Sequence, residues 1–314
     1  MSAFKEQSLI RAGRWLRDSG YSFITPTPAT HARVNARADA GRARNLRDVF
    51  GWSRPFDAAL LARDVLGWMQ DAALLREESG LLRSTVRFSS LGGQLYAHSA
   101  YPTSDADAVF FGPDTYRFAA LIEAQLQQEP LRTGARILDI GCGAGPGGMT
   151  AALTSAGAQP ELVLADINPH ALLHARANAA LAGLDRVTLA QSDLYAQVDG
   201  AFDLIVANPP YLVDASARTY RHGGGPLGGG LSVRIVAEGL PRLAPGGRLL
   251  LYTGAAMVDG QDPLFEALKP LVDSSAVQWR YWELDADVFG EELDAPAYRA
   301  AERIAAVALV AQRR

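Results

Sequence analysis

Short apolar runs alternate with alanine-rich helical stretches after residue 115, and this alternation constrains the fold more than any other feature of the chain. Each run is bounded by turn residues. Strands that alternate with helices along a sequence are typical of a parallel sheet with crossover helices. The pattern therefore predicts strands at 136–140, 161–165, 187–190, 203–207 and 248–252.

Two more strand candidates lie near the carboxyl end, at residues 277–283 and 304–310. No obvious crossover helix separates them, and antiparallel strands need none. We therefore expect an antiparallel edge on the parallel sheet, which gives an α/β fold with a seven-stranded sheet.

The amino-terminal hundred residues have a different, mostly helical pattern. Residues 8–18 and 57–75 place large apolar side chains three and four positions apart, which predicts one-sided helices. Residues 85–88 and 94–97 alternate around Leu91-Gly92-Gly93 as in a hairpin. Helices followed by a hairpin resemble a winged-helix layout, which other small domains share. Turn residues at 101–105 predict a boundary between domains 1–104 and 105–314.

Composition excludes several classes of protein. The 314 residues are 48% hydrophobic and 20% charged, as in folded soluble proteins. No apolar stretch approaches the roughly 20 residues of a membrane helix, and the amino terminus lacks the apolar centre of a secretory signal. We therefore expect no membrane partner and a cytoplasmic location. Cys142 is the single cysteine, which excludes an internal disulfide and a cysteine zinc cluster. The spacing of the histidines from acids predicts no metal site.

Charge is distributed unevenly along the chain. Residues 1–54 contain Lys5 and nine arginines against four acids, a net charge of +6, whereas the whole chain has −4. Such a basic arm is typical of contact with phosphate backbones or with an acidic partner surface. Solvated helix faces explain the same charges equally well.

A glycine-rich turn follows the strand expected at 136–140. Glycines 141, 143, 145, 147 and 148 accumulate just before an expected helix. Glycine accepts unusual backbone angles, and amide groups at a helix amino terminus attract anionic groups. The turn suits the carboxylate of S-adenosylmethionine. The same letters contain the dinucleotide fingerprint Gly143-x-Gly145-x-x-Gly148, so a nicotinamide cofactor remains an alternative. A tight turn without a ligand is the third interpretation.

Two acids follow the next strands. Asp166 ends the second strand, where a carboxylate can accept both ribose hydroxyls of a nucleoside. Its alternative role is to cap the helix that follows. Asp193 follows the third strand and can accept an adenine amino group, with a plain surface turn as the alternative.

The segment Asn208-Pro209-Pro210-Tyr211 follows the fourth strand. An amide or aromatic amino nitrogen has a delocalised lone pair, so a methyl donor reaches it in line only if the NH₂ group is gripped and turned. The Asn208 side-chain oxygen and the Pro209 carbonyl can each accept one N–H, and the prolines stiffen the loop. Tyr211 can stack on the planar acceptor. The segment predicts N-methyl transfer without a metal; prolines that merely end a strand are the alternative.

With these residues in place, the chain resembles class I methyltransferases of the NPPY type, most closely the release factor glutamine methyltransferase (HemK-like) family. The matching blocks are LDIGCGAG at 138–145, ADINPHALLHARANA at 165–179, NPPY at 208–211, and the glycine-leucine and proline-glycine-glycine blocks at 228–251. The resemblance covers about residues 105–310. It implies the Rossmann-like methyltransferase fold and the cofactor S-adenosyl-L-methionine. It also implies a cofactor site at Asp139, Gly141, Gly143, Gly145, Asp166, Asp193 and Asn208, and an acceptor clamp at Asn208, Pro209 and Tyr211.

Two segments depart from the family pattern. Residues 110–115 (FFGPDT) replace an Arg-Pro-Glu-Thr-Glu segment that borders the substrate, and Tyr252-Thr253-Gly254 stands where the family has an acid. The expected partner is therefore a methyl acceptor of open identity, either a protein glutamine, as in a release factor, or RNA, which the basic arm favours. A small molecule or DNA adenine is an alternative acceptor. The other classes are a nicotinamide-dependent oxidoreductase and a catalytically inactive cofactor-binding protein.

Overall fold

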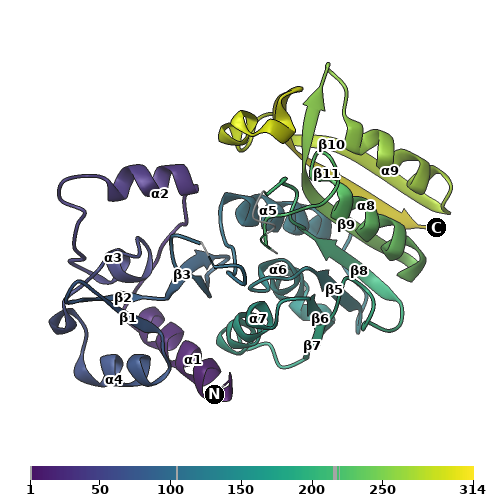
Figure 1. Cartoon of the computed structure of the whole chain (residues 1–314). Coiled ribbons are helices and arrows are strands. Elements are labelled where there is room, and N and C mark those ends of the chain that lie inside the picture. Colours follow the sequence, from purple (N-terminus) through teal and green to yellow (C-terminus); the bar gives the residue numbers. More distant parts are fainter. Residues whose placement is uncertain (1, 104, 215–217, 219) are drawn as a thin grey trace. The chain divides into compact units, whose positions relative to one another are not determined.

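The computed structural model describes residues 2–103, 105–214, 218 and 220–314, which form two compact units (Figure 1). The N-terminal unit comprises Met1–Arg117, Gly143–Pro146 and Pro169–Asp185. The sheet unit comprises Phe118–Cys142, Gly147–Asn168 and Arg186–Arg314. The domain boundary at 104/105 stays a prediction.

The sheet unit contains the expected Rossmann-like seven-stranded sheet, in the order β10-β11-β9-β8-β5-β6-β7. The five strands from β9 to β7 in this order are mutually parallel. The strands are β5 (Arg136–Ile140), β6 (Glu161–Asp166), β7 (Val187–Gln191), β8 (Phe202–Ala207), β9 (Leu243–Val258), β10 (Val277–Asp285) and β11 (Ala301–Arg313).

Burial on both faces explains why these strands are so clear in the sequence. Every residue of β8 is buried, as are the last four residues of β5. Parallel strands that are covered on both faces have continuous runs of apolar residues in the sequence. One hydrophobic core joins side chains of the central strands to those of the helices α8 (Gly230–Gly239) and α9 (Pro263–Asp273). Asp262 starts α9 by accepting the Phe265 N–H at 3.0 Å.

The two carboxyl-terminal strands are arranged differently from a simple antiparallel edge. The antiparallel pairing of β10 with β11 is confirmed, but β11 also pairs antiparallel with β9 and so lies between the two. β10 therefore has the same direction as β9. The helix α9, which lies between β9 and β10 in the chain, provides the crossover that a parallel strand requires.

The N-terminal unit combines helices with two hairpins. It contains α1 (Ser2–Asp18), α2 (Pro28–Asn35), α3 (Leu46–Phe50), α4 (Arg63–Asp71), the hairpin β1 (Leu75–Glu78) with β2 (Leu81–Ser84), the predicted hairpin β3 (Val86–Leu91) with β4 (Gln94–Ser99), and α7 (Pro169–Leu181). The helix α7 packs on α1 through Leu181, and its Asn178 side chain bonds both backbone groups of Ala97. The helix that lies between β6 and β7 in the sequence thus belongs to the core of this unit.

The expected helix at 57–75 is wrong in its extent. It is divided into a short 3₁₀ turn, Ala58–Leu60, and α4, and the strand β1 begins at Leu75. Leu61 and Ala62 have extended backbone angles, which interrupts any helix there. The apolar spacing correctly predicted that Trp68 and Met69 lie on a buried face, but it did not predict the interruption of the helix.

The remaining elements connect the larger ones. They are α5 (Pro113–Gln128), α6 (Pro146–Thr154) and the 3₁₀ helices Ala156–Ala158, Leu240–Arg242, Gly290–Asp294 and Pro296–Tyr298. Within the described part of the chain, no helix combines the length and the apolar character needed to cross a bilayer.

Candidate active site

The strand order reverses between β5 and β8. From β5 the chain proceeds to β6 and β7 in one direction, whereas β8 and β9 lie on the other side of β5. Ile140 at the end of β5 pairs with Ala165 of β6 and with Ala207 of β8. Ligands of open parallel sheets bind at the carboxyl ends of the strands at such a reversal.

The predicted residues Gly141, Asp166, Asp193 and Asn208 therefore emerge along one edge of the sheet. They follow or end β5, β6, β7 and β8, which are consecutive in the sheet order. Three strand spacings separate β8 from β7, a span of roughly 14 Å. An elongated ligand can contact all four residues at once.

The turn after β5 has the backbone that its glycines allow. Gly141, Gly143 and Gly145 have φ angles of 67°, 54° and 85°, a region that other residues rarely adopt. The Cys142 N–H donates to the carbonyl of Ala165 at 3.0 Å and so ties the start of the turn to β6. Gly143 and Gly145 lie in the stretch that belongs to the N-terminal unit, and their part in cofactor binding stays a prediction.

Asp139 holds the far end of this turn. Its side chain is buried on β5, and its Oδ2 accepts the Gly148 N–H at 2.7 Å. A Cβ at Gly148 would lie 2.9 Å from that of Asp139, so only glycine permits this approach. Burial raises the pKa of the Asp139 carboxyl to about 7, against the Gly148 hydrogen bond, and the charge of Asp166 adds to the rise. The observed geometry gives Asp139 a role in positioning the turn.

Asp166 is partly exposed at the end of β6. Its Oδ1 accepts the Asn168 N–H at 2.9 Å, just before α7 begins at Pro169. This bond closes an Asx turn before the helix and reaches no N–H of the helix itself, so the capping role that the sequence offered as an alternative stays a prediction. Ile167 follows with 52% of its surface exposed. Sequence reasoning missed this apolar side chain, which is suited to contact a flat ring.

Asp193 lies on the surface beyond β7. Its side chain is 59% exposed, and Oδ1 lies 3.7 Å from Nη1 of Arg234 on α8. An exposed pair of this kind contributes little to stability. Asp193 is therefore available to a ligand, although its contact with adenine stays a prediction.

Asn208 is half-buried directly after β8. Among the described residues, its side chain has no hydrogen-bond partner, and the carbonyl of Pro209 accepts none. Because Asn208 is only half-buried, water can reach its amide when no ligand is bound. The two acceptors expected from the sequence are thus both present and unused.

Tyr211 is held more tightly than expected. Only 6% of its surface is exposed, and its ring lies edge-on to Phe289 with centroids 5.9 Å apart. A Cβ at Gly254 of β9 would lie 2.2 Å from the ring, so the glycine at this position makes room for Tyr211. Stacking of Tyr211 on an acceptor stays a prediction.

The glycine-rich loop 223–230 supports the same segment from behind. A Cβ at Gly223 would meet the Pro210 carbonyl at 2.6 Å, and one at Gly228 would meet the Tyr211 carbonyl at 2.1 Å. The Gly223 N–H also donates to the Leu212 carbonyl at 2.8 Å. These contacts give the glycines of the loop a role in close backbone packing.

Charged groups fix the chain beyond Tyr211. Buried Asp214 binds Arg218 through its side chain and lies 3.5 Å from Arg221, and the guanidinium of Arg218 holds the pKa of Asp214 at about 2. The Val213 N–H donates to the Tyr298 hydroxyl at 2.9 Å. Sequence reasoning missed these residues, and only the i, i+4 spacing of Asp214 and Arg218 signalled a pair.

The segment 110–115 begins α5. The Gly112 N–H donates to Oγ1 of Thr115 at 3.3 Å, and Phe111 is buried in the N-terminal unit, stacked on His98 at 5.0 Å between ring centroids. Its implied place at the border of the substrate stays a prediction.

Comparison with known proteins agrees with this geometry. A family model described as "Methyltransferase small domain" matches residues 119–257. A release factor glutamine methyltransferase of Deinococcus radiodurans is 37% identical over 221 residues, which cover 62% of this chain and 77% of that protein. One of Cereibacter sphaeroides is 33% identical over 259 residues, covering 76% and 89%. A ribosomal RNA small subunit methyltransferase C of Salmonella arizonae is 37% identical over 112 residues, covering 34% of this chain and 32% of that protein.

Proposed function

The chain belongs to the release factor glutamine methyltransferase family and is an S-adenosylmethionine-dependent methyltransferase, and from this premise we propose that it methylates a planar NH₂ nitrogen held between Asn208 and Pro209. The observation that carries the proposal is the pair of unused acceptors at the end of β8. Membership of this family also removes the nicotinamide interpretation of the glycine turn.

The residues at the strand ends fit the cofactor. Asp166 places a carboxylate at the end of β6, where it is proposed to accept the ribose hydroxyls, and the exposed Ile167 beside it offers an apolar surface to the adenine. Asp193 and the turn at Gly141, Gly143 and Gly145 complete the set proposed to contact it. Asn208 lies at the other end of the same row of strands, on the side proposed for the reacting methyl group.

The bound cofactor supplies a methyl group on a positively charged sulfur. The Asn208 Oδ1 and the Pro209 carbonyl each accept one N–H of the acceptor, which turns the nitrogen toward that methyl group. As the nitrogen gains the methyl group it would lose one proton, which would pass through the oxygen that accepts it, Asn208 Oδ1 or the Pro209 carbonyl, to water. Orientation of this kind is worth about 7–11 kcal/mol of barrier in favourable cases.

We propose the side-chain amide of a protein glutamine as the acceptor. The support is the family relationship, which extends over three quarters of the chain in the Cereibacter protein. The proposed location is the cytoplasm, where release factors act.

An exocyclic amine of RNA is the second candidate. Six basic residues of the first 54 make no ion pair among the described residues: Lys5, Arg11, Arg14, Arg33, Arg37 and Arg47. Unpaired cations are what contact with a phosphate backbone requires.

Transfer of a radiolabelled methyl group to purified release factor or to ribosomal RNA tests the function. Asn208→Ala should lower turnover at least about 100-fold, because a lost hydrogen bond costs roughly 1–3 kcal/mol and misalignment adds to it. Affinity for S-adenosylhomocysteine, measured by calorimetry, should stay nearly unchanged. Gln278→Ala removes an exposed amide from β10 and serves as the matched control. Full turnover by the Asn208 variant would refute the clamp.

A further inference from the structure

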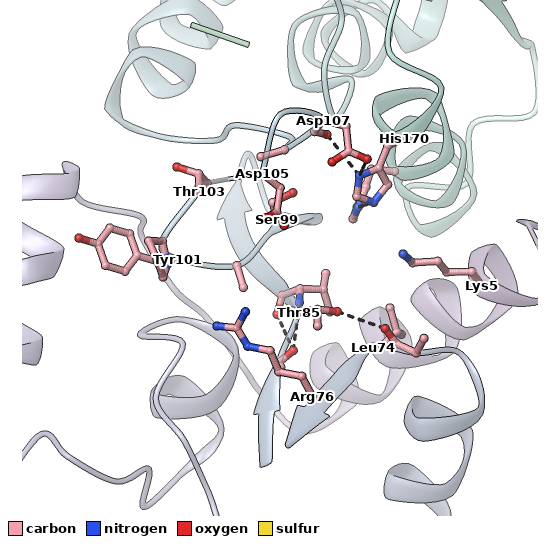
Figure 2. A pocket seen from close by; sticks show the side chains of 17 residues that line it. Lys5, Leu74, Arg76, Thr85, Ser99, Tyr101, Thr103, Asp105, Asp107 and His170 are labelled. Carbon is pink, nitrogen blue, oxygen red and sulfur yellow. Dashed lines mark hydrogen bonds and ion pairs between the residues drawn. The ribbon is translucent and has the colours of Figure 1, made fainter. Parts of the chain in front are cut away.

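The polar cavity of the N-terminal unit brings opposite charges together and indicates no particular ligand (Figure 2). It has a volume of about 270 Å³, and in it Lys5 lies beside His170 and Asp107. The Asp107 carboxylate is 3.4 Å from Nδ1 of His170. A cation next to a carboxylate favours neither an anionic nor a cationic ligand. A more specific set of contacts lies in the sheet unit.

The chain between β10 and β11, residues 286–300, is a connection that belongs to the sheet unit. It starts against the sheet, where the Val288 N–H donates to the carbonyl of Ile304 of β11 at 2.7 Å, and it contains two 3₁₀ helices. Side chains of three residues in this connection contact Tyr211 and the chain beyond it. The proposed function uses none of the three.

The first contact is aromatic. The ring of Phe289 lies edge-on to that of Tyr211, with centroids 5.9 Å apart. Phe289 has a φ of 56°, a left-handed backbone angle that a bulky residue rarely adopts. Such an angle costs free energy and persists where the surrounding structure requires it, often at a functional site. The connection therefore places this ring beside Tyr211 at a cost in conformational energy.

The second contact is a hydrogen bond. Tyr298 is 1% exposed, and its hydroxyl oxygen accepts the Val213 N–H at 2.9 Å. Burial raises the pKa of Tyr298 above its ordinary value, so the hydroxyl keeps its proton at neutral pH. Val213 is the second residue after Tyr211. The bond therefore fixes the backbone directly beyond the aromatic contact.

The third contact is an ion pair. Glu292 binds Arg221, and the two side chains are 15% and 23% exposed. Nε of Arg221 also lies 3.5 Å from Oδ1 of buried Asp214. Pairs that are partly removed from water are screened less than surface pairs, and loss of one partner leaves the other charge uncompensated. Glu292 therefore holds Arg221, and through it the chain at Asp214.

We propose that Glu292 and Tyr298 are positioning residues for methyl transfer. Through Arg221 and Val213 they hold the backbone that follows the acceptor clamp, and so keep the two acceptor oxygens in the arrangement that turns the NH₂ group toward the cofactor. Preset orientation of this kind changes the rate of a reaction more than it changes cofactor affinity. The inference rests on the proposed function, because the geometry that these residues preserve is that of the clamp.

Methyl transfer to purified release factor, measured on the full chain, tests the proposal. Tyr298→Phe removes the hydroxyl and keeps the ring, and Glu292→Gln removes the charge and keeps the length of the side chain. Each should lower kcat about tenfold, because a misplacement of about 1 Å lowers a rate by up to about 100-fold. KM for S-adenosylmethionine should change less than about twofold, because the cofactor is proposed to bind mainly at the ends of β5, β6 and β7.

Tyr281→Phe and Glu283→Gln are the matched controls. The Tyr281 hydroxyl donates to Oδ2 of Asp262 at 2.6 Å, and Oε2 of Glu283 accepts from Nη1 of Arg303 at 2.8 Å. Each control therefore removes the same kind of group from β10, next to the connection. Both should keep kcat within about twofold of wild type, because these contacts are away from the clamp and the ion pair is exposed.

Amide hydrogen exchange distinguishes positioning from a general loss of stability. Residues 208–212 lie before Val213, whose own hydrogen bond Tyr298→Phe removes. Exchange over residues 208–212 should be at least about fivefold faster in Tyr298→Phe and Glu292→Gln, because local opening becomes easier. Exchange in β5 and β8 should stay at the wild-type rate in both variants and in both controls.

Two results would overturn the proposal. One is wild-type kcat in both variants, or an equal loss of kcat in the controls. The other is faster exchange over the whole sheet unit, which would reduce the two residues to a general role in stability. Failure of the proposed function is a different result, in which wild type transfers no methyl group to release factor or to ribosomal RNA. In that case, unchanged exchange over residues 208–212 in the two variants overturns the positioning separately.

Discussion

Replacement of Asp139 by Asn is expected to change stability by an amount that depends on pH. The Asp139 carboxyl is buried, has the Gly148 N–H as a hydrogen-bond donor, and has its pKa raised from 3.8 to about 7. The raised pKa means that the folded state prefers the protonated carboxyl. This contribution to stability is complete below about pH 4 and is lost as the pH rises through about 7.

The size of the effect follows from the two pKa values. At pH 8 the shift corresponds to a cost of about 4 kcal/mol for holding the ionised carboxylate in the folded protein, and at pH 5 to about 2 kcal/mol. Asn keeps an oxygen for the Gly148 N–H and removes the charge. Its new buried NH₂ group has no assigned acceptor, which cancels about 1–3 kcal/mol of the stability gained by removing the charge, at either pH. Relative to wild type, the free energy of unfolding of the variant should therefore be about 2 kcal/mol more favourable at pH 8 than at pH 5.

Urea denaturation followed by circular dichroism at pH 5 and pH 8 measures this difference. Asp185→Asn is the control, because Asp185 is exposed and its replacement removes the same charge. A stability difference between the Asp139 variant and wild type that is the same at both pH values would show that the carboxylate is solvated or paired, and the positioning argument for the turn would fail.

Three other substitutions test separate parts of the structure. Asp166→Ala should weaken S-adenosylhomocysteine binding by about 1.5–3 kcal/mol in calorimetry, and equal affinity with a lower thermal midpoint would leave only the capping of α7. Gly254→Ala should displace the Tyr211 ring and lower turnover, at a stability cost of about 1–3 kcal/mol, whereas the control Gly157→Ala has open space around it. Arg87 is 4% exposed, has no acidic partner among the described residues, and has its pKa lowered to about 10 by burial. Arg87→Met should therefore stabilise the protein at pH 7 by up to about 3 kcal/mol. A lower free energy of unfolding in urea would contradict this prediction.

The strands of the sheet were predictable because buried parallel strands are continuous runs of apolar residues in the sequence. The strand predicted at 136–140 is β5, and the strand predicted at 203–207 differs from β8 by one residue. The place of β11 between β9 and β10 was not predictable, because pairing between distant strands depends on the whole sheet and not on local pattern. The prediction of one helix over 57–75 was wrong for a local reason. Apolar spacing indicates which face is buried, but it does not indicate the break in the backbone at Leu61 and Ala62.

The positions of Asp166 and Asn208 at the same edge of the sheet, at the ends of the strands on either side of β5, were predictable from topology alone. The carboxyl ends of parallel strands share one edge, so residues that end strands meet there. The packing behind Asn208 was not predictable, because Gly254 and Phe289 are distant in sequence from Tyr211 and the positions of neither follow from local pattern.

The contrast between Asn208 and its neighbours explains how this segment can act. Tyr211 is fixed by Gly254 and Phe289, and the backbone at Pro210 and Tyr211 is backed by Gly223 and Gly228. Two acceptors without partners among the described residues therefore directly precede a closely packed stretch of backbone, which helps to hold them in place for an incoming NH₂ group. These glycines allow close packing but carry no side chain that could contact a ligand. Their replacement by alanine should therefore lower the rate of methyl transfer without altering the affinity for the cofactor.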